Sequence, residues 1–371
     1  MKKVMIVFGT RPEGIKMAPV IKELKRFPEK FEVKVCSTGQ HREMLDQVLD
    51  FFGIVCDYNL DVMSPNQSLS DVTCKILKGI DEIFTVWHPD MVLVQGDTTT
   101  VMAASLAAFY HKIEVGHVEA GLRTGNIYSP WPEEMNRLLT TRLSMIHFAP
   151  TAGARDNLLR EGIEETAIHI TGNTVIDALF DAEKILDADL KQTASLKKKF
   201  SFLSDDKRLI LVTGHRRENF GDGFQQICHA IAKIAVREDV QIVYPVHMNP
   251  KVRMPIHDIL GQCANVNLIE PQDYPSFLYL MRKSYLILTD SGGVQEEAPS
   301  LGKPVVLMRD TTERPEAVKA GTVILTGADC AKIVSVVTCL LDDKSFYEKM
   351  AKANNPYGDG KASWRIRQIL S

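Results

Sequence analysis

Short apolar runs alternate with longer segments of helical periodicity along the first half of the chain. Residues 41–52, 69–87 and 133–143 repeat apolar positions every three or four residues, which predicts amphipathic helices. Alternation of strand and helix predicts a parallel sheet covered by helices on both faces. The predicted strands of this first half are residues 4–8, 32–37, 91–95, 115–119 and 146–149.

A second set of strands and helices follows the charged stretch 187–207. Its predicted strands are residues 209–213, 241–245, 266–269, 286–289, 305–308 and 323–325. The sequence therefore predicts an α/β fold with two doubly wound, Rossmann-like domains, and such domains bind ligands where their parallel strands end. We expect the C-terminal ends of both sheets to face one cleft. The boundary is placed near Gly172, giving domains of residues 1–172 and 173–356, and the tail 357–371, with its spaced apolar residues, is expected to return to the first domain.

Composition and charge narrow the classes of protein to which the chain can belong. At 371 residues it is too long for one ordinary core, and its 45% hydrophobic and 25% charged content is that of a soluble globular protein. A net charge of −3 argues against nucleic acid or an anionic membrane as a partner. No apolar run approaches a membrane span, and the N-terminus lacks the features of a signal peptide. Seven cysteines without a CxxC pair read as reduced, mostly buried thiols in a cytoplasmic protein.

Charged residues follow several strands of the first domain. After the first strand, Gly9 permits a tight turn and Pro12 suits the start of a helix, so Arg11 and Lys16 lie near the strand end. They read either as two cations for a diphosphate or as surface charge. Asp97 follows the 91–95 strand before three threonines, which suits either a helix N-cap or a role in catalysis or ligand binding.

Two further carboxylates follow in the first domain. His117 and Glu119 are expected on one face of their strand, and a buried carboxylate is costly unless it is used or paired. A metal site would need more His or Cys ligands at close spacing than this stretch offers. Glu133 starts a helix after a stiff segment with two prolines and a tryptophan, which suits helix-dipole compensation or chemistry.

In the second domain, one stretch predicts an anion site. Thr289-Asp290-Ser291-Gly292-Gly293-Val294-Gln295-Glu296-Glu297 joins a buried strand to the start of a helix, which exposes backbone N–H groups at the positive end of the helix dipole. The glycines let a phosphate approach the backbone, and one of the glutamates suits a sugar hydroxyl. His215 follows another strand directly, and Gln272 and Phe277 suit a platform for a planar base.

The chain lacks the fingerprints of several common enzyme classes. It contains no GxGxxG dinucleotide motif, no GxxxxGK[ST] P-loop and no GxSxG elbow. Cations, a helix-terminus anion site and several carboxylates remain, and a nucleoside-diphosphate sugar matches that set.

Ordered motifs along the whole chain resemble one family. These are Phe8-Gly9-Thr10-Arg11-Pro12-Glu13, Gln40-His41-Arg42-Glu43-Met44-Leu45, Gly96-Asp97-Thr98-Thr99, Gly116-His117-Val118-Glu119-Ala120-Gly121-Leu122-Arg123-Thr124, Pro132-Glu133-Glu134-Met135-Asn136-Arg137, Thr213-Gly214-His215-Arg216-Arg217-Glu218 and the stretch 289–297. Together they resemble the bacterial non-hydrolysing UDP-N-acetylglucosamine 2-epimerases. The resemblance implies a GT-B-type fold and reversible conversion of UDP-GlcNAc to UDP-ManNAc without metal or nicotinamide, for surface polysaccharide. It further implies a homodimer and a regulatory UDP-GlcNAc site, whose matching segment includes Gln40 and His41.

The resemblance also assigns roles by motif. The residues that match catalytic positions are Asp97, Glu119, Glu133 and His215. Those that match UDP-binding positions are Arg11, Lys16, Gln272, Phe277, Ser291, Gly292, Gly293, Glu297 and Arg314. The sequence departs from many relatives at Gln95, where they have histidine, and from close relatives at Gly14, where they often have alanine.

The chemistry of C2 inversion favours elimination. The C2 hydrogen is unactivated. Inversion therefore needs either transient oxidation, which requires a nicotinamide cofactor, or loss of UDP to give 2-acetamidoglucal. Two sugar faces then need two acid/base groups, which several carboxylates supply. A UDP-sugar glycosyltransferase, a hydrolysing relative that releases ManNAc, and a nucleotide-sugar sensor remain as alternatives.

Overall fold

The computed structural model describes residues 1–40, 42–214 and 221–371, which divide into two compact units. The first unit is Met1–Ala182 with Tyr357–Ser371, and the second is Glu183–Pro356. The dividing point after Ala182 falls inside helix α7 (Thr174–Ala188), whereas the sequence analysis placed it near Gly172. The described helices include none whose length and apolar character would let it cross a bilayer.

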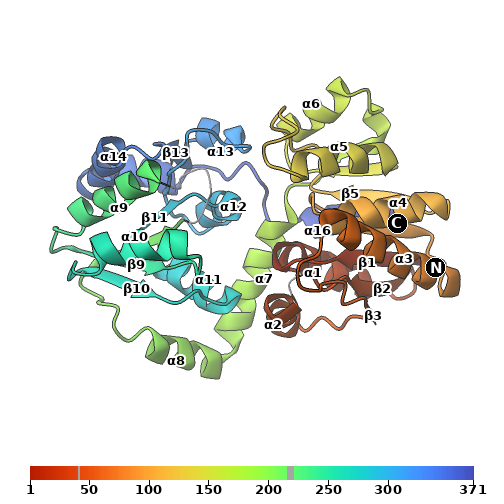
Figure 1. Cartoon of the computed structure of the whole chain (residues 1–371), viewed down its shortest axis with the longest axis horizontal. Coiled ribbons are helices and arrows are strands. Elements are labelled where there is room, and N and C mark those ends of the chain that lie inside the picture. Colours follow the sequence, from red (N-terminus) through yellow and green to blue (C-terminus); the bar gives the residue numbers. More distant parts are fainter. Residues whose placement is uncertain (41, 215–220) are drawn as a thin grey trace. The chain divides into compact units, whose positions relative to one another are not determined.

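The first unit is built on a parallel sheet with strand order β3-β2-β1-β4-β5-β6-β7 in the described part of the chain (Figure 1). Its strands are β1 (Lys2–Phe8), β2 (Phe31–Ser37), β3 (Tyr58–Asn59), β4 (Met91–Gln95), β5 (Glu114–Val118), β6 (Ile146–Ala149) and β7 (Ile168–Ile170). Its helices, besides α7, are α1 (Arg11–Lys25), α2 (Arg42–Phe52), α3 (Leu69–Val86), α4 (Thr99–Tyr110), α5 (Glu133–Leu143), α6 (Ala152–Arg160) and α16 (Ala362–Leu370), with a short 3₁₀ turn, η1 (Glu165–Ala167).

The local sequence explains why α3 forms and which face it buries. Ser68 and Asp71 make a reciprocal capping box at its N-terminus. Val72, Ile76 and Ile80 follow at four-residue spacing, are buried, and pack on the sheet beside residues of β1 and α4. Burying one such side chain stabilises the fold by about 1.5–3 kcal/mol, so this stripe fixes the helix against the sheet.

The C-terminal tail belongs to the first unit, as the sequence predicted. Helix α16 packs against α1, and Arg367 donates from Nε to Glu23 Oε1 at 2.7 Å. The backbone N–H of Asn173 donates to the carbonyl of Tyr357 at 2.6 Å, which ties the start of the tail to the turn before α7.

The second unit repeats the architecture with strand order β10-β9-β8-β11-β12-β13 among the described residues. Its strands are β8 (Arg208–Thr213), β9 (Val240–Pro245), β10 (Val266–Ile269), β11 (Leu286–Thr289), β12 (Val305–Leu307) and β13 (Val323–Leu325). Its helices are α8 (Leu190–Lys199), α9 (Asp222–Ile234), α10 (Pro250–Leu260), α11 (Tyr274–Lys283), α12 (Gly292–Ser300), α13 (Pro315–Ala320), α14 (Cys330–Asp342) and α15 (Lys344–Ala351). The predicted α/β class with two doubly wound, Rossmann-like domains is confirmed.

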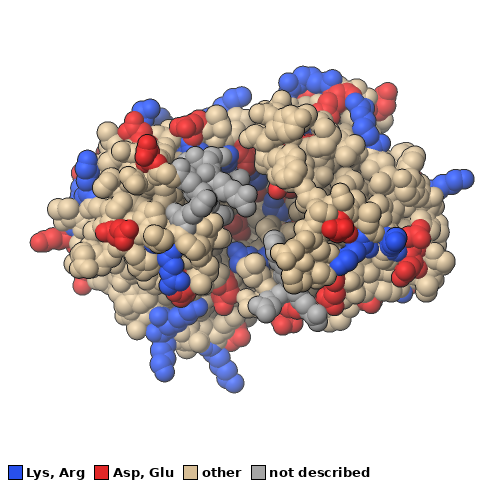
Figure 2. Space-filling view, in the orientation of Figure 1, with Lys and Arg blue, Asp and Glu red and all other residues tan. Residues whose placement is uncertain are grey.

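The strand orders show where each unit is expected to bind a ligand. In the first sheet the order reverses between β1 and β4, and in the second it reverses between β8 and β11. Ligands of open α/β sheets bind beyond the carboxyl ends of strands at such a reversal. The segments that follow these strands are therefore the ones to inspect. On the face drawn in Figure 2, Lys and Arg side chains lie beside Asp and Glu side chains in several places.

Candidate active site

The turn after β1 is closed by a carboxylate of the chain itself. Glu13 Oε2 accepts hydrogen bonds from the backbone N–H groups of Gly9 and Thr10 at 2.8 and 2.7 Å, and Glu13 Oε1 accepts from Thr98 Oγ1 at 2.5 Å. Burial raises the pKa of the Glu13 carboxyl, and the hydrogen bonds from Thr98, Gly9 and Thr10 oppose that rise. Glu13 thus caps α1 and joins the turn after β1 to the turn after β4.

Glu119 lies just beyond β5 and is held by two side chains. Lys16 Nζ approaches Glu119 Oε2 at 2.5 Å, and Gln95 Nε2 donates to the same oxygen. Glu119 has φ of 65°, a left-handed conformation that is costly for a residue with a Cβ. The prediction that His117 and Glu119 share one face of a strand is therefore wrong, because β5 ends at Val118 and the alternation stops there. An ammonium carries three N–H donors, so this pairing leaves the predicted UDP contact of Lys16 chemically possible.

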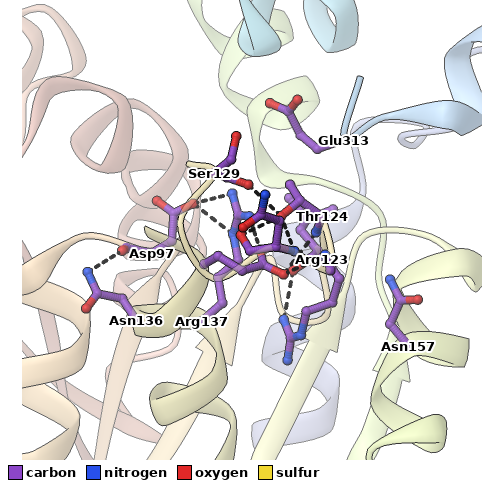
Figure 3. Close-up of polar contacts among 12 residues, drawn as sticks. Asp97, Arg123, Thr124, Ser129, Asn136, Arg137, Asn157 and Glu313 are labelled. Atoms are coloured by element: carbon purple, nitrogen blue, oxygen red, sulfur yellow. Dashed lines mark hydrogen bonds and ion pairs between the residues drawn. The ribbon is translucent and has the colours of Figure 1, made fainter. Parts of the chain in front are cut away.

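Asp97 is held by Arg137 of α5 (Figure 3). Nη2 and Nε of Arg137 donate to Asp97 Oδ2 at 2.6 and 3.0 Å, and Nη1 donates to Glu134 Oε2 at 2.7 Å. Asn136 Nδ2 donates to the backbone carbonyl of Asp97 at 2.9 Å. The N-cap of α4 is Thr98, whose Oγ1 accepts from Val101, so the reading of Asp97 as a helix cap is wrong.

Glu134, next to the predicted Glu133, anchors the loop before α5. Its Oε1 accepts from the backbone N–H groups of Thr124 and Gly125, both at 3.0 Å. Glu133 is half-buried, and its carboxylate has no hydrogen-bond or ion-pair partner among the described residues. The network in Figure 3 therefore fixes the loop and Asp97, while the carboxylate of Glu133 is left available for chemistry.

His117 is fully buried on β5 beside this site. Its Nε2 donates to the carbonyl of Gly96 at 2.7 Å, which supports the turn that carries Asp97. Burial lowers the pKa of His117 to about 3, and the hydrogen bond to Gly96 opposes that shift. His117 is therefore a neutral structural donor at pH 7. Within the described ranges, no group of three or more His, Cys, Asp and Glu side chains is arranged to hold a metal ion.

In the second unit, the start of α12 carries the predicted anion site. Ser291 is the N-cap of α12 without a side-chain capping bond, so the first N–H groups of the helix are not capped by that hydroxyl. A Cβ added at Gly292 would lie 2.6 Å from Nη1 of Arg314, so only glycine lets the guanidinium pack against this turn. Arg314 Nε donates to Glu296 Oε1 at 2.5 Å, and Nη1 donates to Glu313 Oε1 at 2.6 Å. The turn thus combines a helix N-terminus with a buried, oriented guanidinium.

The predicted base platform lies at the start of α11 in the same unit. Gln272 Nε2 donates to the carbonyl of Glu270 at 2.5 Å, and Gln272 Oε1 is buried without a partner among the described residues. Phe277 is half-buried in the first turn of α11. Tyr274 Oη donates to Glu297 Oε1 at 3.1 Å, which ties α11 to α12. An unpaired buried amide oxygen costs about 1–3 kcal/mol, which a ligand N–H donor would recover.

Of the remaining predicted site residues, the structure describes Arg11 and Gln40. Arg11 is half-buried at the start of α1, and Gln40 Oε1 accepts from Thr100 Oγ1 at 3.2 Å. His41 and His215 lie outside the described residues.

Sequence reasoning assigned no role to Glu13, Glu134 or Arg137, and it named Gln95 only as a departure from many relatives that could alter the surroundings of Asp97. The spacing of Glu134 and Arg137, three apart on a helix, could have indicated their ion pair. Nothing in the local sequence points to their partners on the turns after β4 and β5.

Comparison with known proteins agrees with the fold and with the motifs. A family model described as UDP-N-acetylglucosamine 2-epimerase matches residues 22–371. The UDP-N-acetylglucosamine 2-epimerase of Escherichia coli (strain K12) is 60% identical over 370 residues, which cover 99% of this chain and 98% of that protein. The chain belongs to the UDP-N-acetylglucosamine 2-epimerase family.

Solved structures of this family match the whole chain. The UDP-GlcNAc 2-epimerase from Neisseria meningitidis, bound to UDP-GlcNAc, is 54% identical with a TM-score of 0.94 and coverage of 99% of both chains. The UDP-GlcNAc 2-epimerase from Methanocaldococcus jannaschii, in complex with UDP-GlcNAc and UDP, is 37% identical with a TM-score of 0.84 and coverage of 99% of both chains. The predicted family membership is thereby confirmed.

Proposed function

We propose that this epimerase-family protein interconverts UDP-GlcNAc and UDP-ManNAc by eliminating UDP and adding it back, without releasing free ManNAc. The observation that carries the proposal is the set of three carboxylates, Asp97, Glu119 and Glu133, on the turns after β4 and β5 and at the start of α5. Their surroundings differ: Asp97 faces a guanidinium, Glu119 an ammonium and an amide, and Glu133 no described polar partner. Carboxylates in different surroundings can act as acid and base at the same pH.

In the proposed reaction, a base removes the C2 proton while the anomeric C–O bond to UDP breaks. The electron pair of the C–H bond forms the C1–C2 double bond of 2-acetamidoglucal, and UDP takes the electrons of the C–O bond. A proton is then added to C2 from the opposite face as a phosphate oxygen of UDP re-forms the bond to C1. Atoms and electrons balance without an oxidant, and the catalytic roles of Asp97, Glu119, Glu133 and His215 are part of this proposal.

The second unit is proposed to hold UDP. The N-terminus of α12 suits a phosphate, because its leading N–H groups and the dipole favour an anion. Arg314, already oriented by Glu296 and Glu313, supplies a guanidinium beside Gly292. The buried Oε1 of Gln272 suits the N–H of a uracil ring beside Phe277. Ser291, Gly293 and Glu297 complete the proposed set in this unit, with Arg11 and Lys16 as the contacts in the first unit.

The wider setting is proposed from the family resemblance. We infer a cytoplasmic homodimer that supplies ManNAc-type sugars for surface polysaccharide and responds to UDP-GlcNAc through the segment of Gln40 and His41. Light scattering coupled to size-exclusion chromatography tests the oligomeric state. A strict monomer at micromolar concentration would remove the dimer from the proposal.

Product analysis with UDP-GlcNAc as the sole substrate tests the function. Proton NMR of the anomeric signals should show UDP-ManNAc accumulating to an equilibrium mixture. Stoichiometric free ManNAc would make the protein a hydrolase, a requirement for an acceptor would make it a glycosyltransferase, and ligand binding without turnover would make it a sensor.

Variants then test the residues. Asp97→Asn, Glu119→Gln and Glu133→Gln should each fold and lose turnover by about 10²–10⁴-fold, the usual contribution of an acid/base group. Glu82→Gln, which changes an exposed carboxylate on α3, is the matched control and should keep full activity. A variant that keeps near-parental turnover removes its residue from the catalytic set.

A further inference from the structure

Gln95 is a buried amide at the carboxyl end of β4 that has no role in the proposed reaction so far. It is 2% exposed, and its Nε2 donates to Oε2 of Glu119. Gln95 pairs in register with Val118, the last residue of β5, so the amide lies beside the first residue after that strand. The contact therefore joins the ends of the adjacent strands β4 and β5, and β4 borders the point where the order of the first sheet reverses.

The surroundings of Glu119 show what that contact accomplishes. The carboxylate is 5% exposed, so an ionised form needs strong donors in place of water. Lys16 Nζ at 2.5 Å supplies the charge, and Gln95 supplies a second donor to the same oxygen. Two donors that approach one oxygen from α1 and from β4 also fix the direction of the carboxylate, which a single flexible lysine would not do.

The backbone of Glu119 adds an independent observation. Its φ of 65° is a strained conformation for a residue with a Cβ, and such conformations persist only where the surroundings impose them. The backbone strain and the two hydrogen bonds to the carboxylate, from α1 and from β4, together fix the position of Glu119.

We propose that Gln95 is a positioning residue that holds Glu119 ionised and aimed for proton transfer at the sugar. The proposal rests on the proposed function of Glu119. Because an amide does not titrate, Gln95 acts in the same way at every pH, and the only proton exchanged at this pair is that of Glu119.

Among the described residues, charged and titratable groups lie near Glu119 on several neighbouring elements. Lys16 of α1 touches the carboxylate, and His117 of β5 stays neutral because burial lowers its pKa to about 3. Asp97 and Arg137 form their own ion pair on the turn after β4 and on α5. Loss of the hydrogen bond from Gln95 therefore favours the protonated form of Glu119 without removing any charge from the site.

The test compares the pH dependence of kcat for wild type, Gln95→Leu and Gln95→Glu. Gln95→Leu removes the donor at similar volume, so kcat should fall at least tenfold with KM for UDP-GlcNAc changed less than about twofold. The acid limb of the kcat profile should move up by about one pH unit, because Glu119 is protonated more easily. Gln95→Glu keeps the shape but sets a second carboxyl against Glu119, so its limb should move further. If Gln95→Leu fails to fold, Gln95→Glu decides the question.

Gln241→Leu is the matched control. Gln241 is also a buried glutamine on a strand, near the start of β9, and its side chain bonds to the backbone of Phe202 and Ser204 in the second unit. The Gln241→Leu variant should be less stable than wild type, and the acid limb of its kcat profile should stay where it is in wild type. An unshifted limb with unchanged kcat in both Gln95 variants, while Glu119→Gln is inactive, overturns the positioning role and leaves the proposed function intact. Full activity in Glu119→Gln overturns the proposed function itself.

Discussion

Acidification should destabilise the first unit because His117 is buried in a neutral form. Its Nδ1 is buried without a hydrogen-bond partner among the described residues, and its Nε2 is committed to the carbonyl of Gly96. A proton on Nδ1 would create a charge in a site that offers it no acceptor. Burial accordingly lowers the pKa of His117 from 6.5 to about 3.

The size of the effect follows from linkage. Between the unfolded pKa of 6.5 and the folded value of about 3, the unfolded chain binds a proton that the native chain does not, so stability rises with pH in that window. At pH 5.0, about 1.5 units below the unfolded pKa, protonation of His117 stabilises the unfolded chain by about 2 kcal/mol, at 1.36 kcal/mol per unit. The stability that neutral His117 contributes is fully present above pH 6.5 and is lost as the pH falls towards 3. His147, in register with His117 on β6 and with a pKa lowered by burial to about 4, should lose a similar amount at pH 5.0.

The assay is urea unfolding followed by tryptophan fluorescence at pH 8.0 and pH 5.0. The three tryptophans, Trp87, Trp131 and Trp364, all lie in the first unit, so their signal reports the unit that contains His117. Wild type should lose about 2 kcal/mol more than His117→Asn between the two pH values. His229→Asn, which changes an exposed histidine on α9, is the control and should lose as much as wild type. Equal losses in wild type and His117→Asn would refute the reasoning.

Four further predictions concern the ion pairs and the anion site. Arg11→Ala should weaken UDP binding by about 1.5–3 kcal/mol in calorimetric titration, as expected for a lost charge-assisted contact; unchanged affinity would remove Arg11 from the site. Arg314→Lys keeps the charge but loses the planar fork and should weaken UDP binding about tenfold, whereas Arg237→Lys on the surface of the same unit should not; equal affinities would contradict this. Arg137→Lys cannot reach both of its carboxylate partners and should lower kcat at least tenfold in the epimerase assay, so an unchanged rate would make that network purely structural. Glu13→Leu leaves the backbone N–H groups of Gly9 and Thr10 without their carboxylate acceptor and should lower the free energy of unfolding, measured in urea, by about 1–3 kcal/mol; an equally stable variant would show that the turn holds without Glu13.

The fold was predictable because most of its strands are largely buried and many of its helices are amphipathic. The predicted strands 91–95 and 286–289 coincide with β4 and β11, and the predicted helix 133–143 coincides with α5. Strands β3 and β7 were missed because neither is an apolar run: β3 is Tyr58–Asn59, and β7 (Ile168–Ile170) has a histidine between its two isoleucines. The end of β5 was misplaced by one residue because positive φ at Glu119 depends on its surroundings and has no local sequence signal.

The site was predictable in its residue types but not in its pairings. Motifs at strand ends indicated Asp97, Glu119 and the turn at Ser291, since topology places strand ends together. They could not indicate that Lys16 forms an ion pair with Glu119 or that Arg137 forms one with Asp97, because these partners are 103 and 40 residues apart. Long-range pairing of this kind is decided by tertiary packing, which a linear pattern does not contain.

Epimerisation of UDP-GlcNAc in deuterated water, without added cofactor, tests the central claim most directly. If a base removes the C2 proton and an acid returns one from solvent, the UDP-ManNAc signal should appear by proton NMR with deuterium at C2. Trace UDP and 2-acetamidoglucal are expected at long incubation. Product that retains the original C2 hydrogen, or formation that depends on added NAD, would contradict the elimination account.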